Sequence, residues 1–196
     1  RVCRRDGLML TFVFVGRIVR DKGVDELVAA FVKLNRIYSN TRLLLVGPYE
    51  EHLNPVQWGT KFLIDTCECI EAVGAQKDVR PFYEQSDVLV FPSYREGFPN
   101  VVIEAGAMEL PSIVTDINGS REIIEDGRNG LIVPARDEQA LFGAMKWIVE
   151  HDEERNAMAA HARPMIASRY EQGYVRGCLK NYYKEIFSRN CGSFAK

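Results

Sequence analysis

The segment DVLVFPSYREGFPNVVIEAGAMELPSIVTD, residues 87–116, decides the fold. Its first apolar run, Val88–Phe91, is typical of a strand that is covered on both faces. A helix is predicted over Pro99–Met108, with proline in its first turn, and Ser112–Thr115 is a second predicted strand. Strand, helix and strand in this order form a βαβ unit, and such units build parallel sheets.

The same alternation continues upstream. A buried strand is predicted at Leu8–Val15, followed by a charged turn at Arg17–Gly23, an amphipathic helix and a second buried strand at Leu43–Val46. The stretch from Tyr49 to Val73 has no clean period, and we expect a loop, then a helix, then a short strand near Ile70–Val73.

The remaining elements complete a doubly wound α/β domain. A short helix is predicted at Val79–Ser86 and a last strand at Leu131–Val133, and three further helices follow at Glu138–Glu150, Asp152–Ser168 and Glu171–Phe187. We expect the apolar stripe of the last helix to pack on the body; it includes Tyr182, Tyr183 and Phe187. No repeat or linker divides the chain, so residues 1–196 are predicted to be one Rossmann-like α/β domain with a doubly wound parallel sheet and C-terminal helices.

Composition excludes several classes of protein. The 196 residues are 46% hydrophobic and 27% charged, which is typical of a folded globular domain. A net charge of −2 gives no global field to attract nucleic acid, and no apolar run is long enough to span a membrane. Five scattered cysteines favour a reducing compartment, so the cytoplasm is the expected location. The histidines and cysteines form no metal-ligand cluster, so no metal site is predicted.

Ligands of parallel sheets bind outside the carboxyl ends of the strands. The loop GRIVRDKG, residues 16–23, places Arg17 at the end of a strand and Lys22 just before a helix. Two cations beside a helix N-terminus favour an anion such as phosphate. A solvated basic turn is the alternative interpretation of this loop.

Two carboxylates mark the loop and helix after Phe91. Glu96 lies in the loop, and Glu104 lies in the helix, with seven residues between them. A helix that begins near Pro99 leaves backbone N–H groups uncapped in the same crevice, and these belong to Phe98, Asn100 and Val101. Each carboxylate can accept paired hydrogen bonds from sugar hydroxyls, so one carboxylate for each of two sugars is predicted. Taken singly, each could also be an ordinary surface charge.

Together these segments resemble the C-terminal, donor-binding half of the retaining glycosyltransferases of family 4, whose GT-B fold sets two Rossmann-like domains face to face. The resemblance covers about residues 8–187. It rests on GRIVRDKG, on the segment at 87–116, and on NGSREIIEDGRNGLIVP at residues 118–134.

The resemblance implies a role for each matching residue. Arg17 and Lys22 would hold the distal phosphate of a sugar nucleotide and stabilise the departing diphosphate, and Glu96 would bind the transferred sugar; these three form the expected catalytic set. Glu104 would bind the nucleotide ribose. The other expected donor contacts are Gly16, Gly97, Phe98, Asn100 and Val101.

Two further segments have weaker implied roles. Residues 74–79 match the stretch that lies against the base, so Gln76 and Val79 are the expected nucleobase contacts. Residues 118–122 would close the pocket wall through Gly119, and Glu122 is interpreted as a charge at the start of a helix.

The resemblance implies transfer of a hexosyl or N-acetylhexosaminyl group, without a metal or cofactor, from a nucleoside diphosphate sugar, by default a UDP-sugar. The acceptor would be a saccharide or a lipid-linked saccharide in polysaccharide or glycolipid biosynthesis. The acceptor-binding N-terminal domain would be absent from this chain, which alone would be inactive, and any peripheral membrane association would lie on that domain. Two alternatives stay open: a GT-B sugar-nucleotide epimerase, and a non-catalytic module that binds nucleotide sugars.

Overall fold

The computed structural model describes residues 9–50, 52 and 54–191, with side chains to residue 187. Within these residues, six parallel strands form one sheet in the order β3-β2-β1-β4-β5-β6. In chain order the strands are β1 (Leu10–Val15), β2 (Thr41–Val46), β3 (Ile70–Gly74), β4 (Val88–Phe91), β5 (Ser112–Thr115) and β6 (Gly130–Val133). The predicted doubly wound parallel sheet is therefore confirmed. The predicted start of the first strand at Leu8 lies outside the described residues.

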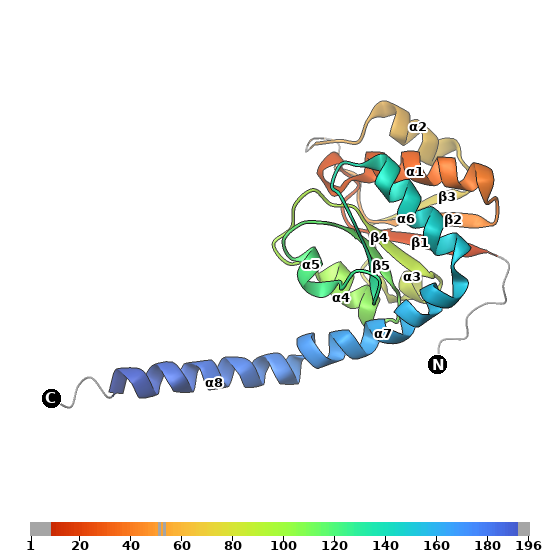
Figure 1. The fold of residues 1–196 in the computed structure, drawn as a ribbon. Coiled ribbons are helices and arrows are strands. Elements are labelled where there is room, and N and C mark those ends of the chain that lie inside the picture. Colours follow the sequence, from red (N-terminus) through yellow and green to blue (C-terminus); the bar gives the residue numbers. More distant parts are fainter. Residues whose placement is uncertain (1–8, 51, 53, 192–196) are drawn as a thin grey trace.

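Helices cover both faces of the sheet (Figure 1). One face carries α1 (Val24–Ile37), α2 (Trp58–Thr66) and α6 (Glu138–Glu150). The other carries α3 (Arg80–Glu84) and α4 (Asn100–Ala107), and α7 (Asp152–Tyr170) packs on α4. Two short helical turns complete this part of the chain, the 3-10 turn η1 (Arg20–Lys22) and α5 (Ser120–Ile123).

The central strands β1, β2 and β4 form the core because they are covered on both faces. Phe12 packs edge-on against Phe31 of α1, and Phe14 stacks on Phe91 of β4. All four of these aromatic side chains are buried. Their removal from water is the main force that holds the sheet and α1 together.

The start of α4 differs from the prediction by one residue. Pro99 is the residue that precedes the helix, with an extended ψ of 99°, and is not part of the first turn. Its carbonyl accepts from the N–H of Val102 at 3.1 Å. Proline suits this position because it has no N–H of its own to satisfy.

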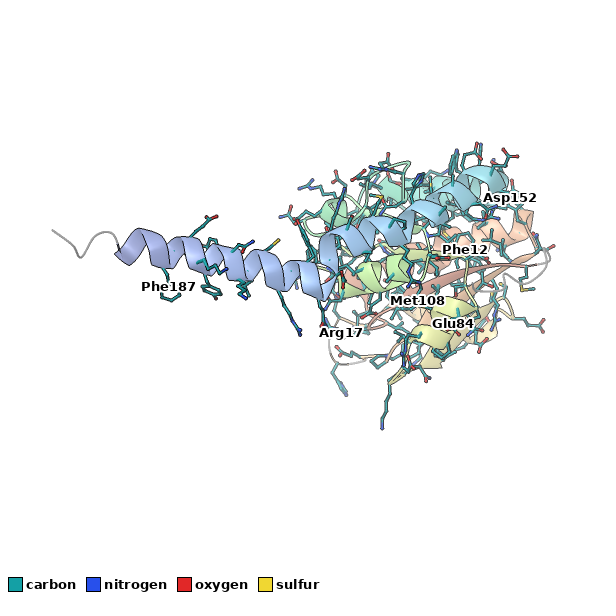
Figure 2. The ribbon with its side chains drawn as sticks, turned by 90° about the horizontal axis from the view of Figure 1, so that it is seen from below. Phe12, Arg17, Glu84, Met108, Asp152 and Phe187 are labelled. Carbon is teal, nitrogen blue, oxygen red and sulfur yellow. The ribbon has the colours of Figure 1, made fainter. Side chains whose placement is uncertain are left out.

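The packing expected of the last helix is wrong. Helix α8 (Gln172–Cys191) continues the direction of α7 away from the body and touches the rest of the described chain only near its start (Figure 1). Figure 2 shows α7 lying along the body from Asp152, whereas Phe187 on α8 lies far from the sheet. Phe187 is 67% exposed, and Tyr182 and Tyr183 are also exposed. The apolar stripe exists, but no described residue covers it.

Candidate functional site

The loops that follow β1, β2 and β4 meet at the carboxyl edge of the sheet. The N–H of Ile18 donates to the carbonyl of Pro48 at 2.8 Å, which joins the first loop to the second. The N–H of Tyr94 donates to the carbonyl of Asp21 at 2.9 Å, which joins the first loop to the loop after β4. Residues 16–23 therefore lie between the other two loops, and the cations that they carry lie at the centre of this edge.

Gly23 makes the contact with the β4 loop possible. Its φ is +70°, and a Cβ at this position would lie 2.1 Å from the carbonyl oxygen of Pro92. Only glycine combines this left-handed conformation with so close an approach. Helix α1 therefore begins directly against the loop that carries Glu96.

The structure brings Lys22 and Glu96 together. The Lys22 ammonium forms an ion pair with Glu96 Oε1, and both side chains are only 16% exposed. The hydroxyl of Ser93 donates to the same carboxylate oxygen at 2.7 Å. The Lys22 ammonium also lies 5.7 Å from the centre of the Phe91 ring. These contacts hold the lysine and the glutamate in fixed positions beside the start of α4.

Arg17 has a partner that the sequence analysis missed. Its Nη1 donates to Glu50 Oε2 at 2.8 Å, across a separation of 33 residues. The Arg17 side chain stays half exposed, so it remains accessible to a ligand. No motif joins the two residues; the parallel pairing of β1 with β2 is what places their loops side by side.

The segment before α4 is held by the loop after β5. A Cβ on Gly119 would lie 2.6 Å from the carbonyl oxygen of Gly97, and the φ of Gly119 is +81°. Glu122 accepts from the N–H of Gly119 at 3.3 Å, so the prediction that Glu122 is a charge at a helix start is confirmed. The Phe98 ring packs edge-on against Tyr170 at 5.5 Å. Its side chain therefore points toward α7.

The expected donor contacts at the start of α4 lie within reach of solvent. Gly97, Phe98 and Asn100 are exposed, and Val101 is half-buried. The first N–H groups of a helix have no acceptor within the helix and carry a partial positive charge. A helix start of this kind beside a lysine can bind an anion.

Glu104 is oriented by a buried tyrosine on the neighbouring helix. The Tyr83 hydroxyl donates to Glu104 Oε2 at 3.2 Å, while the Glu104 side chain itself is exposed. Burial raises the pKa of Tyr83 well above its usual range, and the charge of Glu104 raises it further. Tyr83 therefore stays a neutral donor that can hold the carboxylate in place. The sequence analysis missed this residue because Tyr83 fits a short apolar helix equally well.

The expected nucleobase contacts lie at or before the start of α3, whereas Tyr83 lies near its end. Gln76 is exposed, and its side-chain amide donates to the Val73 carbonyl at 2.8 Å. Val79 is half-buried and caps the start of α3. Through α3 this stretch is continuous with Tyr83, and hence with the Glu104 side of the site.

Two kinds of feature are absent from the described residues. No group of three or more His, Cys, Asp or Glu side chains in this part of the chain is arranged to hold a metal ion. None of the helices described is both long and apolar enough to cross a membrane.

The chain is similar in sequence to known glycosyltransferases. The capsular polysaccharide biosynthesis glycosyltransferase CapM of Staphylococcus aureus is 28% identical over 179 residues, which are 91% of this chain and 47% of CapM. The chain thus spans about half the length of the curated relatives it matches.

Solved structures share the fold. The C-terminal domain of a group 1 glycosyl transferase, LpcC of Francisella tularensis, superposes with a TM-score of 0.75 at 22% identity, over 83% of this chain and 87% of that domain. Anabaena Alr3699/HepE in complex with UDP-glucose superposes with a TM-score of 0.79 at 18% identity, over 90% of this chain and 49% of that one. The family model described as "Glycosyl transferases group 1" matches residues 10–151, and the chain therefore belongs to the group 1 glycosyl transferases, with the fold of their C-terminal GT-B domain.

Proposed function

We propose that this chain is the donor-binding half of a retaining glycosyltransferase of family 4 and binds a nucleoside diphosphate sugar at the carboxyl edge of its sheet. The observation that carries the proposal is the ion pair of Lys22 with Glu96 beside the start of α4. Arg17 lies on the same loop as Lys22. Membership of the group 1 family supports it.

Three groups of residues bind three parts of the donor: the diphosphate, the transferred sugar and the nucleoside. Arg17, Lys22 and the start of α4 bind the diphosphate, because all three present positive charge to one edge. Glu96 accepts hydrogen bonds from hydroxyls of the transferred sugar. Glu104, held by Tyr83, accepts from the ribose hydroxyls, and the base lies toward Gln76 and Val79. The complex of Alr3699/HepE with UDP-glucose favours a UDP-sugar as the donor.

Electrostatics would provide most of the catalysis. When the bond to the sugar breaks, negative charge develops on the diphosphate oxygens. Positioned donors such as Arg17 and Lys22 can each stabilise this charge by about 3 kcal/mol, as deletions of oxyanion-hole donors show. Glu50 and Glu96 form ion pairs with the two cations. The diphosphate must therefore displace these carboxylates or share the cations with them.

The other half of the reaction requires a second domain. We propose that an N-terminal domain of the same protein binds a saccharide or lipid-linked acceptor in polysaccharide or glycolipid synthesis and carries any membrane contact. The group transferred would be a hexosyl or N-acetylhexosaminyl unit.

Calorimetric titration of the chain tests the proposed donor site. We expect saturable binding of UDP, or of one other nucleoside diphosphate among GDP, ADP and CDP, and weaker binding of the matching nucleoside. The absence of saturable binding for all four diphosphates would overturn the proposal.

A further inference from the structure

A cavity of about 230 Å³ lies next to Glu50, the ion-pair partner of Arg17. It is lined by residues of the loop after β2 and of helix α2, together with Ile18 of the first loop. Apolar and aromatic groups form most of its wall, namely Ile18, Tyr49, Pro55, Val56 and Trp58. Two charged residues complete the wall: Glu50, the partner of Arg17, and Lys61 of α2, whose ammonium lies 5.6 Å from the centre of the Tyr49 ring. A volume of this size suits a single ring, since pockets for drug-sized ligands start at roughly 300 Å³.

Trp58 presents an aromatic face that no described residue covers. It is 80% exposed, the highest value among the large apolar side chains in the described part of the chain. Its ring stacks on Phe62 with centres 5.5 Å apart and planes at 18°, which fixes its orientation. A large exposed aromatic side chain at the wall of a cavity is typical of a binding site, because a ligand that covers the ring removes apolar surface from water.

Helix α2 is fixed to the body at the point where it carries Trp58. The buried carboxylate of Asp25 on α1 accepts from the N–H of Gln57 at 2.9 Å and from the hydroxyl of Thr60 at 2.5 Å. Gln57, one residue before Trp58, and Thr60, two residues after it, are therefore hydrogen-bonded to α1. The position of the indole is set by the fold.

Glu50 provides the polar end of the cavity. Its Oε2 accepts from Arg17 at 2.8 Å, and the side chain is 30% exposed, so the carboxylate is accessible to a ligand. An aromatic face and a carboxylate together match the chemistry of a pyranose ring: the C–H face of the sugar packs on the aromatic ring, and the hydroxyls at its rim donate to the carboxylate.

The cavity lies on the opposite side of the sheet from the nucleotide residues. Helix α2 covers the face that carries α1 and α6, whereas Tyr83 and Glu104 belong to α3 and α4 on the other face (Figure 1). The loop at residues 16–23 separates the two, with Arg17 paired to Glu50 on one side and Lys22 paired to Glu96 on the other. Through Glu50, a ring in this cavity lies next to Arg17, the residue proposed to hold the distal phosphate of the donor.

We infer that this cavity is a subsite for one pyranose ring of the saccharide acceptor, with Trp58 as its stacking face and Glu50 as its hydroxyl acceptor. The inference rests on the proposed function, since it assigns the acceptor side of the same edge. It means that the donor-binding half also contributes to acceptor recognition.

Tryptophan fluorescence tests the subsite. The chain has two tryptophans, so Trp147→Phe leaves Trp58 as the only reporter. This variant is titrated with the methyl α-glycosides of glucose, galactose, mannose and N-acetylglucosamine. We expect at least one to shift the emission saturably to shorter wavelength, with a dissociation constant on the order of millimolar.

Two variants test the named residues, with binding followed by saturation-transfer NMR. Trp58→Ala should weaken glycoside binding roughly tenfold or more, because the stacking face is lost. Glu50→Gln should weaken it about threefold or more, because a charged acceptor becomes neutral. Tyr182→Ala, which removes another exposed aromatic side chain, on α8, is the matched control and should change nothing.

UDP binding to the same samples separates the two proposals. Glycoside binding without binding of any of the four nucleoside diphosphates would overturn the proposed function, and diphosphate binding without glycoside binding would overturn the subsite. Competition between UDP and the glycoside would assign the cavity to the donor and overturn the inference. So would the absence of a saturable shift with all four glycosides up to roughly 100 mM, or unchanged affinity in Trp58→Ala.

Discussion

Arg17 is the residue whose removal best separates diphosphate binding from nucleoside binding. Its guanidinium is half exposed at the end of β1 and held by Glu50 at 2.8 Å. If it contacts the distal phosphate, Arg17→Ala removes a charge-assisted interaction of about 1.5–3 kcal/mol. We therefore expect roughly 10- to 100-fold weaker UDP binding and almost unchanged uridine binding in calorimetric titrations.

The control for this variant is Arg95→Ala. Arg95 lies on the loop after β4 and is 86% exposed, with Asp21 4.0 Å away. It carries the same charge near the same edge, so a less than twofold effect on UDP would show that the loss in Arg17→Ala is specific. Equal weakening of UDP and uridine in Arg17→Ala would mean that the cation does not contact the phosphates.

At the scale of single residues, sequence reasoning finds groups that belong to one motif and misses those that depend on tertiary contacts. Lys22 and Glu96 were found because each lies in a loop between a strand and a helix, within a segment that has a recognisable pattern, and the structure pairs them. Glu50 and Tyr83 were missed because their partners lie 33 and 21 residues away in the chain. Neither residue type is unusual where it stands, so only the fold shows what it contacts.

At the scale of single elements, the start of helix α1 requires glycine at position 23. In Gly23→Ala the new Cβ would lie 2.1 Å from the Pro92 carbonyl oxygen at a φ of +70°. We expect destabilisation of about 2 kcal/mol or more in urea denaturation, because both the backbone conformation and the packing must change. Loosening of the loop should also weaken UDP binding, since Lys22 is the preceding residue.

The matched control is Gly143→Ala in α6. A Cβ at Gly143 would have no heavy atom within 4 Å, and the residue lies in the interior of a helix. Alanine is the better helix former by about 0.8–1 kcal/mol, so this variant should be as stable as the parent or more so. If the two glycine variants lost stability equally, the contact of Gly23 with Pro92 would not be the cause.

An ion pair with Glu125 ties the end of α7 to the segment after α5. Glu125 accepts from Arg169 and, at 2.7 Å, from Arg128, and these hydrogen bonds lower the pKa of its carboxyl. A carboxyl with a lowered pKa in the folded state stabilises the fold above its pKa in the unfolded chain, about 4.3. This contribution is lost as the pH falls through the folded-state pKa.

Glu125→Gln should therefore melt at a lower temperature than the parent at pH 7, and the difference should shrink as the pH falls below about 4. Thermal melts followed by circular dichroism at several pH values measure this difference. Glu68→Gln, at an exposed loop carboxylate without an ion pair to another described residue, is the control and should change the midpoint little at any pH. A difference that stayed constant down to acid pH would exclude the ion pair as its source.

Element boundaries were predicted well where periodicity was strong. The helices at Glu138–Glu150 and near Asp152–Tyr170 and the strands at Val88–Phe91 and Ser112–Thr115 lie where the pattern placed them. Helix α2 was predicted only as a helix somewhere within 49–73. Its outer face carries the exposed rings of Trp58 and Phe62 beside polar residues, so the usual contrast between a buried and a solvated face is weak there.

At the scale of the whole molecule, α8 is the element that the body does not stabilise. No side chain between residues 172 and 187 is buried, although apolar residues recur along the helix at Tyr174, Val175, Leu179, Tyr182 and Tyr183. The periodicity predicted an apolar stripe correctly, but it could not tell whether a partner for that stripe lies in the same chain.

An unpacked helix of this length should open easily in solution. Isolated helices are marginal in water, and the glycines at positions 173 and 177 lower the helix propensity of its first turns. We expect hydrogen exchange in α8 to be on the order of 100-fold faster than in α7, whose Met158 and Ala162 are buried. Mass spectrometry of exchanged peptides measures both helices in one sample, so α7 is the internal reference.

Removal of residues 172–196, followed by urea denaturation, tests whether α8 contributes to the stability of the rest of the chain. Because none of the described α8 side chains is buried, the shortened chain should have the same free energy of unfolding as the parent, within the error of about 10% that extrapolation to zero urea carries. If the parent associates through its exposed stripe at high concentration, the shortened chain should remain monomeric there. Equal protection of α7 and α8, together with a lower midpoint for the shortened chain, would show instead that α8 is packed in solution. If that protection weakened on dilution, the partner would be a second copy of the chain.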